Sequence, residues 1–447
     1  MADLMLSVMY FGVLLGLGII VANILKKAGI PDTFFLLLLG LLLGPTIYAN
    51  PAITSYISTT LVDVGVMGNI PDFLRVLALI MVVFTGTFNL GLRTLKKFGN
   101  MAINIALAGV LVNTVVMGFV ANVFFGIDLV YSFLLAAVVS GTCTSVVFAF
   151  EGTLKKASKP LNIIKVESIL NSPLSVLLPI IFLGFVAIEP GALIDPMRYL
   201  NQFWVMIAVG VGAGLIMGIG LGRVLKGMLK EYSALMLFAV ALITYALAEN
   251  VGGSGMLAVA VAGLISGSAL KNRHDNVQQF DDHLSEMLRI AVFTLLGAQV
   301  SLFIGLEEFL LILAFFLIMF FIRPVLLFPL LGKKKNEFSR DEFLVMSFIT
   351  PRGLSAAAMA PIVATAIIAA GMPEFAASMM NIIFLVIMFS VLFSTVFAVS
   401  MGRKFRGQPM KKEKSKPAVE QEERVSETEA GYGTGNPGTG ESGTVVS

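Results

Sequence analysis

The sequence has few charged residues: 13% of its 447 positions are Asp, Glu, Lys or Arg, against about 25% in a typical soluble domain. Apolar residues make up 57% of the chain, and the mean hydropathy is +0.91. This composition excludes a soluble globular protein, because far too little of the chain is polar enough to cover a water-exposed surface. It predicts an all-α polytopic membrane protein embedded in a lipid bilayer.

The chain also has a single cysteine, Cys143, and two histidines. One cysteine forms no internal disulfide, and the sequence has no spacing of Cys or His that is typical of a zinc or haem site. We therefore expect no cofactor and no resident metal. The net charge of +3 is small and gives no sign of a nucleic-acid partner. Glycine runs at 210–214 and 218–222 follow no predicted strand, so we expect close helix packing there rather than a phosphate loop.

Long hydrophobic runs fill the chain up to about residue 401. At about 20 apolar residues for each crossing, they predict about thirteen transmembrane helices. The ranges are 4–25, 31–48, 71–91, 101–124, 129–150, 163–188, 200–222, 233–250, 254–270, 286–304, 308–331, 342–370 and 375–401. The first run lacks the basic start and the cleavage site of a signal peptide, so we expect it to remain as a span.

Basic residues gather in every second connection between these runs. They are Lys26, Lys27, Arg93, Lys96, Lys97, Lys155, Lys156, Lys159, Arg223, Lys226, Lys230, Lys271, Arg273, Lys333, Lys334, Lys335 and Arg340. The positive-inside rule places these connections in the cytoplasm, so the N-terminus should lie outside a cell membrane and the C-terminus inside. Residues 403–447 turn polar and glycine-rich, and we expect a disordered cytoplasmic tail behind a transmembrane domain of residues 1–402.

Three polar stretches interrupt the apolar runs. Residues 140–145 break the fifth run, residues 350–353 break the twelfth, and residues 165–173 open the sixth. Polar groups and broken backbone are tolerated inside a membrane where they line an enclosed cavity. Two broken helices, one in each half, are typical of transporters with inverted repeats and a site near the midplane. We therefore interpret the three stretches as one transport site.

Several short motifs resemble those of a known family. They are residues 84–95, residues 167–171, residues 245–263, the Arg323-Pro324 pair and residues 351–354. In this order they resemble the NhaP-like sodium/proton exchangers of the monovalent cation/proton antiporter superfamily, over about residues 1–405. The resemblance implies two crossed broken helices and a homodimer. It also implies an elevator-like exchange of Na⁺, Li⁺ or K⁺ for H⁺, in which core helices around 71–188 and 286–401 move against a dimerisation domain.

The same resemblance assigns the site residues. The family pairs Thr-Asp on the first broken helix with a Glu-Ser-x-x-Asn-Asp run on the next helix. The matching positions here are Thr142, Cys143, Glu167, Ser168, Asn171 and Ser172. Both aspartates are therefore replaced, by Cys143 and Ser172. Since a thiol is a soft ligand and a hydroxyl stays neutral, the usual two-carboxylate mechanism does not transfer unchanged.

Three charged residues remain inside the predicted spans near these positions. The resemblance implies that Glu167 forms an ion pair with Arg323, which would be a structural role; direct binding of an ion or proton by Glu167 stays open as the alternative. Arg352 lies at the second break, where a cation offsets the carbonyl dipoles of a half-helix end.

We accordingly expect a secondary active transporter rather than an enzyme. The first hypothesis is a monovalent cation/proton antiporter whose ions bind at the six matching positions, with Arg323 and Arg352 as the intramembrane cations. The loss of two carboxylates keeps a second hypothesis open, a transporter of an anion or a neutral solute on the same fold. A third is a transport-inactive sensor or scaffold that signals through its tail.

Overall fold

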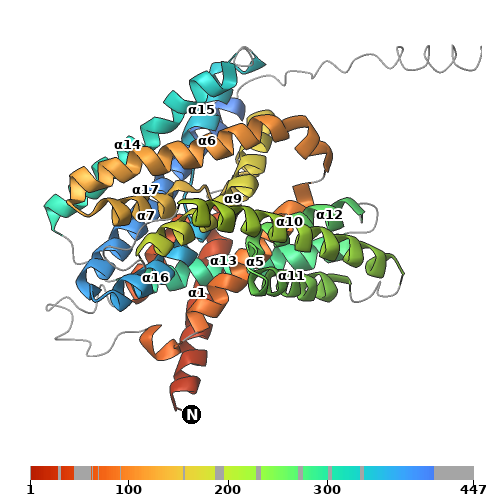
Figure 1. Ribbon diagram of the computed structural model, residues 1–447, viewed down its shortest axis with the longest axis horizontal. Coiled ribbons are helices and arrows are strands. Elements are labelled where there is room, and N and C mark those ends of the chain that lie inside the picture. Colours follow the sequence, from red (N-terminus) through yellow and green to blue (C-terminus); the bar gives the residue numbers. More distant parts are fainter. Residues whose placement is uncertain are drawn as a thin grey trace, which may run out of the picture. The chain divides into compact units, whose positions relative to one another are not determined.

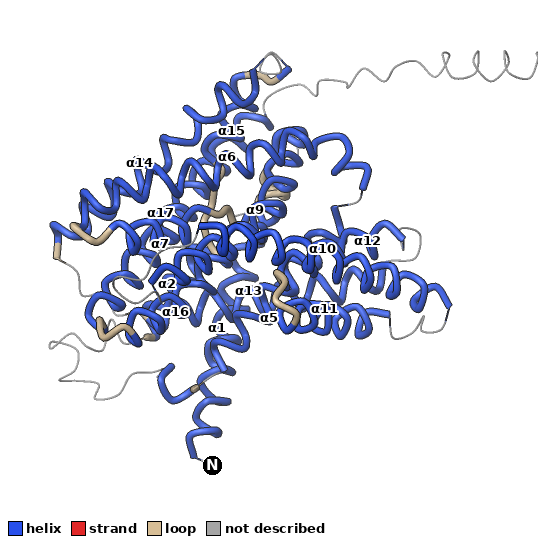
Figure 2. Tube along the Cα trace, viewed as in Figure 1, coloured by secondary structure: helices blue, strands red, loops and turns tan. Residues whose placement is uncertain are grey.

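The structure is a computed structural model, and its described residues are helical, with no β-strand among them (Figure 2). The described residues are 2–28, 32–44, 62, 64–68, 70–90, 92–154, 157–186, 196–227, 233–269, 275–300, 305–332 and 337–406. Met1–Phe405 forms one compact unit. Disorder is predicted for residues 403–447; of these, residues 403–406 are instead the end of a helix that reaches Arg406, and residues 407–447 lie outside the described part.

The described helices follow the predicted spans one by one, with two spans broken in two. They are α1 (Ala2–Ala28), α2 (Thr33–Leu43), α5 (Ile70–Leu90), α6 (Leu92–Phe125), α7 (Leu129–Ser140), α8 (Thr144–Ala149), α9 (Ser158–Val186), α10 (Pro196–Gly227), α11 (Ser233–Asn250), α12 (Gly255–Ala269), α13 (Asp275–Gln299), α14 (Leu306–Leu331), α15 (Arg340–Phe348), α16 (Leu354–Ala369) and α17 (Pro373–Arg406). A short 3₁₀ helix, η1 (Val64–Met67), precedes α5. Six of the α-helices are long and apolar enough to cross a membrane by themselves. The protein is a polytopic all-α membrane protein.

The two breaks lie at the polar stretches that the sequence marks. Between α7 and α8 the backbone is extended at Gly141 and Cys143. Between α15 and α16, Pro351 has no N–H to donate and disfavours helical backbone in the residue before it. The breaks meet, because the Cys143 N–H donates to the Pro351 carbonyl at 2.7 Å. The expectation of two crossed broken helices is thus confirmed.

Within the compact unit the helices pack in two groups (Figure 1). The scaffold group consists of α1, α2, α5, α10, α11, α12 and α13; in it α10 packs on α12, α12 on α5, and α2 on α13. The crossing group consists of α6 to α9 and α14 to α17, with α6, α7 and α9 packed on one another and α14 on α6. Phenylalanine rings of α17 and α14 pack edge-on or tilted against one another, with ring centroids 5.2 to 5.9 Å apart, which attaches α17 to this group.

Glycine seams tie the scaffold group together. A Cβ on Gly40 of α2 would overlap the Thr294 carbonyl oxygen of α13, and one on Gly297 would overlap the Leu37 carbonyl oxygen of α2. The α10–α12 contact is similar: a Cβ on Gly210 would lie 2.8 Å from the carbonyl oxygen of Ser254. Only glycine fits where backbones approach this closely. The predicted packing role of the 210–222 glycine runs therefore holds at the positions that face α12.

Contacts between connections agree with the predicted distribution of charge. Lys159, in the first turn of α9, lies 3.6 Å from Glu337, before α15, and Lys404, near the end of α17, lies 2.6 Å from Asp341. The connections before α9 and before α15 and the segment after the last span were predicted to share one side of the membrane. These contacts bring them together in space. That this side is the cytoplasm stays a prediction.

Candidate functional site

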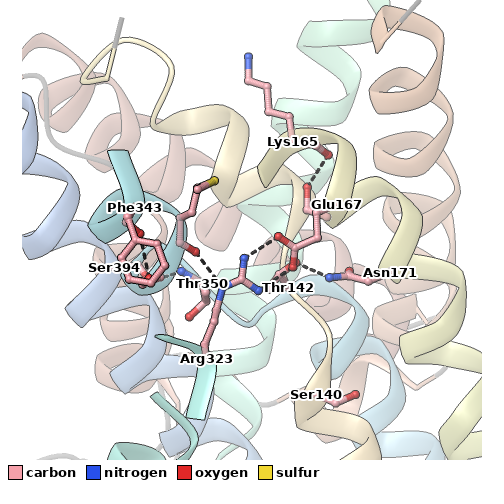
Figure 3. A network of polar contacts seen from close by, with 12 residues as sticks. Ser140, Thr142, Lys165, Glu167, Asn171, Arg323, Phe343, Thr350 and Ser394 are labelled. Atoms are coloured by element: carbon pink, nitrogen blue, oxygen red, sulfur yellow. Dashed lines mark hydrogen bonds and ion pairs between the residues drawn. The ribbon is translucent and has the colours of Figure 1, made fainter. Parts of the chain in front are cut away.

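A buried polar network occupies the crossing (Figure 3). Thr142 comes from the α7–α8 break, Glu167 and Asn171 from α9, and Arg323 from α14. Their exposed fractions are 5% or less. Glu167 and Asn171 lie one helical turn apart, as the sequence spacing predicts, so both reach the same face of α9.

Glu167 and Arg323 form a bidentate ion pair. The two terminal nitrogens of Arg323 donate to the two carboxylate oxygens of Glu167 at 2.6 and 2.5 Å. The Arg323 Nε donates to the Met346 carbonyl of α15 at 2.9 Å. This is the pairing that the resemblance implies, and it joins α9, α14 and α15 in one contact.

Asn171 presents an unused oxygen at the break. Its side-chain nitrogen donates to the Thr142 hydroxyl at 2.5 Å, whereas its Oδ1 is buried with no hydrogen-bond partner among the described residues. A buried amide oxygen without a donor is costly unless a ligand occupies it. The Ser168 hydroxyl instead donates to the Lys165 carbonyl at 2.9 Å, so its proton is used within α9.

The two positions at which the resemblance implies aspartates differ in what the structure describes. Cys143 is buried at the first break, beside Gly353 and Phe293; a Cβ on Gly353 would lie 2.7 Å from its sulfur. Ser172 follows Asn171 on α9, and its side chain lies outside the described part of the structure. A shared site of Cys143 and Ser172 therefore stays a prediction.

Arg352 lies inside the crossing with 2% of its surface exposed. One terminal nitrogen donates to the Ser140 carbonyl, the last residue of α7, and Nε has no partner among the described residues. This arginine therefore contacts the carbonyl end of the other broken helix, where the helix dipole favours a cation.

Arg352 differs from the other buried cations that the structure describes. The others each have a carboxylate partner: Arg289 with Asp32 at 2.7 Å, Lys165 with Glu151 at 2.7 Å, Arg323 with Glu167 at 2.5 Å, and Arg75 with Asp72. No ion pair with a described carboxylate is found for Arg352. The site at the crossing therefore holds one uncompensated positive charge among the described residues.

Sequence reasoning missed several residues that shape the site. Ser390 and Ser394 of α17 accept from the backbone N–H groups of Arg352 and Thr350, at 2.9 and 3.3 Å. The Thr144 hydroxyl donates to the Ser168 carbonyl at 3.0 Å and attaches α8 to α9. The two α17 serines are four positions apart in an apolar span, a spacing that marks one polar helix face and was available in the sequence.

Residues 12–401 match the family model described as "Sodium/hydrogen exchanger, transmembrane". Among curated proteins, the chain is 26% identical over 380 residues to Na(+)/H(+) antiporter 1 of Methanocaldococcus jannaschii, covering 80% of this chain and 83% of the relative. It is likewise 26% identical over 399 residues to the K(+)/H(+) antiporter NhaP2 of Shewanella sp., covering 88% of this chain and 66% of the relative.

A solved structure has the same fold. It is that of the sodium proton antiporter MjNhaP1 from Methanocaldococcus jannaschii at pH 8, which superposes with a TM-score of 0.73. The match covers 91% of this chain and all of that one, at 24% sequence identity. The likeness thus extends over nearly the whole chain and concerns the arrangement of the helices.

Proposed function

The chain belongs to the family of transmembrane sodium/hydrogen exchangers, and we propose on this premise that it exchanges Na⁺, Li⁺ or K⁺ for protons across a cell membrane. The similar proteins named as Na(+)/H(+) and K(+)/H(+) antiporters support this assignment. The observation that carries it is the buried polar site where two broken helices cross. Broken backbone at such a crossing supplies oxygen ligands for a cation inside the membrane.

We assign cation binding to neutral oxygens. Asn171 Oδ1 lacks a donor, and the Thr142 hydroxyl lies 2.5 Å from the nitrogen of the same amide. Ser172, the next residue on α9, is a further ligand by sequence. Hard monovalent cations prefer such oxygens to the sulfur of Cys143.

Glu167 carries the proton coupling in this proposal. It is the one carboxylate among the described residues of the crossing, and both of its oxygens are engaged by Arg323. For a proton to bind, Glu167 must part from Arg323 during the cycle. Coupling therefore requires a state in which this ion pair is open.

Alternating access is assigned to movement of the crossing group against the scaffold group. The glycine seams leave no room for α2 and α13 to slide past each other, whereas a Cβ on Gly86 of α5 would meet Thr144 and Ile169 of the crossing group at 3.3 and 3.7 Å. Smooth apolar contacts of this kind permit sliding. On this basis we place α5 and α13 in the static part, so the proposed moving part is narrower than the ranges 71–188 and 286–401. The scaffold group is then the surface for a homodimer.

The test is transport by the purified protein in liposomes with an imposed pH gradient and a pH-sensitive dye inside. Addition of Na⁺, Li⁺ or K⁺ should dissipate the gradient, and Asn171→Leu should weaken the response. Gly16→Ala is a matched control, because a Cβ at Gly16 meets nothing within 4 Å. Silence of the unaltered protein toward all three cations would overturn the proposal.

One observation favours a second candidate, transport of an anion on the same fold. Arg352 is buried beside a break with no described carboxylate partner, and a buried cation next to a helix N-terminus attracts anions. A proton flux that depends on the anion present and ignores Na⁺, Li⁺ and K⁺ would support this candidate over antiport.

A further inference from the structure

No described carboxylate balances the positive charge of the buried Arg352, so an ion from solution is needed to balance it. Removing a charge from water costs several kcal/mol unless an opposite charge or several hydrogen bonds replace the lost hydration. The other described buried cations meet this requirement with carboxylates, and even Arg75, whose Nε is also unpartnered, contacts Asp72. Among the described residues, Arg352 has the Ser140 carbonyl as a partner, and its buried Nε has none. The carbonyl end of α7 offers only about half a negative charge.

Two of the groups near Arg352 attract negative charge, although the Ser140 carbonyl that it contacts attracts positive charge. The guanidinium reaches Ser140, and the next residue, Gly141, lies beside the first turn of α16: its Cβ would be 3.5 Å from the Ser355 hydroxyl. The first N–H groups of a helix have no acceptor within that helix, and that end of the dipole is positive. Ser355 is 4% exposed and adds a hydroxyl donor. An arginine, a hydroxyl and a helix N-terminus thus converge at one buried place.

The surroundings of Arg352 differ from those that the resemblance implies, because the expected carboxylates are missing. Cys143 stands where the resemblance implies an aspartate, and its backbone N–H is bonded to Pro351, the residue before Arg352. A carboxylate at position 143 would therefore lie close to the break that carries Arg352.

We propose that Arg352 binds a small monovalent inorganic anion, of which chloride is the type, as a resident ligand that replaces the family's fixed carboxylate. The binding itself rests on the geometry of Arg352, while its role in cation exchange rests on the proposed function. The ion completes the site and is not transported. Its ligands are Arg352, the first turn of α16 and Ser355.

Binding is tested on the purified protein without any transport assay. Melting temperature in detergent is compared in sodium chloride, bromide, nitrate and gluconate at equal ionic strength. Chloride and bromide should raise it, saturably, by about 2–4 °C over gluconate if they are bound well below the concentration used. Arg352→Gln should lose this rise, whereas Arg75→Gln, at a buried arginine that has a carboxylate partner, should keep it. Absence of the rise in the unaltered protein would overturn the anion site and leave the proposed antiport untouched.

Position 143 gives a sharper comparison, which also serves if Arg352→Gln does not fold. Cys143→Asp should place a fixed negative charge near Arg352 and lower the apparent chloride affinity at least tenfold, or by about 1.4 kcal/mol. Cys143→Asn has nearly the same shape without the charge and should keep the response to chloride. Equal responses of the two variants would refute the proposal.

A flux measurement separates a resident ion from a transported one. Liposomes containing the protein should take up no more radioactive chloride than empty liposomes. Uptake that depends on the protein would refute a resident ligand and support the second candidate function instead.

Discussion

Replacing Glu167 by Gln is the change with the largest expected effect, because it leaves Arg323 buried without its counter-charge. Glu167 is 1% and the Arg323 side chain 5% exposed, and contacts of 2.6 and 2.5 Å are those of charge-assisted hydrogen bonds. Gln keeps one accepting oxygen, but its NH₂ group then faces an arginine donor. Breaking one side of a buried pair costs about 3–5 kcal/mol, and we expect the free energy of unfolding to fall by this amount.

A double-mutant cycle separates the interaction energy of Glu167 with Arg323 from the other effects of each substitution. Equilibrium unfolding in mixed micelles is followed for Glu167→Gln, Arg323→Met and the combination of both. The combined variant has no stranded charge, so it should be more stable than Glu167→Gln and should give a coupling energy of about 3 kcal/mol. Lys159→Gln is the control, since it breaks an exposed pair and should cost less than about 1 kcal/mol.

Transport by the stabilised double variant then decides what Glu167 does beyond stability. If Glu167 carries the proton coupling, this variant should fold, insert and show no cation-dependent proton exchange. Exchange at the unaltered rate would show that the pair serves structure alone, and the coupling assigned to Glu167 would be wrong. A loss of less than about 1 kcal/mol on Glu167→Gln would refute the argument from burial itself.

Three further changes have definite expected outcomes. Cys143→Asp combined with Ser172→Asp should strengthen Na⁺- and pH-dependent exchange in liposomes. Each single change should have a smaller effect, because two nearby carboxylates must share a proton or a cation. A double variant that inserts into the membrane but shows no gain in exchange would contradict this. Asn171→Leu should raise the Na⁺ concentration needed for half-maximal exchange by about tenfold or more, because one buried polar ligand is lost. An unchanged dependence of exchange on the cation concentration would show that Asn171 is not part of the site. Gly297→Val should lower the melting temperature measurably, at a cost of about 1–3 kcal/mol, because its side chain meets the backbone of α2. Gly16→Val, in open space, should not, and equal effects of both would contradict the packing argument.

The breaks were predictable because their residues have few alternatives inside a membrane. Gly141 and Pro351 interrupt apolar runs that are otherwise long enough to span, and polar neighbours there require a protein-lined site. The pairing of Glu167 with Arg323 came from the resemblance and not from physics. The two residues are 156 positions apart, and no local pattern relates them.

The Arg289–Asp32 ion pair and the contact of Arg75 with Gln299 could not be predicted from the sequence for the same reason. These residues are separated by 257 and 224 positions, so only the packing of α2, α5 and α13 brings them together. The division of the helices into the scaffold group and the crossing group could not be predicted from the sequence either. The core ranges 71–188 and 286–401, which include α5 and part of α13, came from the resemblance, whereas the packing of α5 and α13 against α12 and α2 depends on glycine contacts between distant helices.

The charge of the crossing links the proposed antiport to the anion site. Among the described residues of the crossing, the charges of Glu167 and Arg323 cancel, so Arg352 leaves one positive charge in the empty site, and a bound cation would double it. Two positive charges in a medium of low dielectric repel strongly, which disfavours binding of the cation that the site is proposed to carry. A resident anion brings the empty site to neutrality and the loaded site to a single positive charge. A one-for-one exchange of a monovalent cation for a proton moves no net charge, with or without this anion, so it would be insensitive to the membrane potential, which acts with about 2.3 kcal/mol per charge and 100 mV on any net charge moved. Neutral residues at positions 143 and 172, where the resemblance implies aspartates, are thus compatible with exchange, provided that an anion from solution brings negative charge to the site.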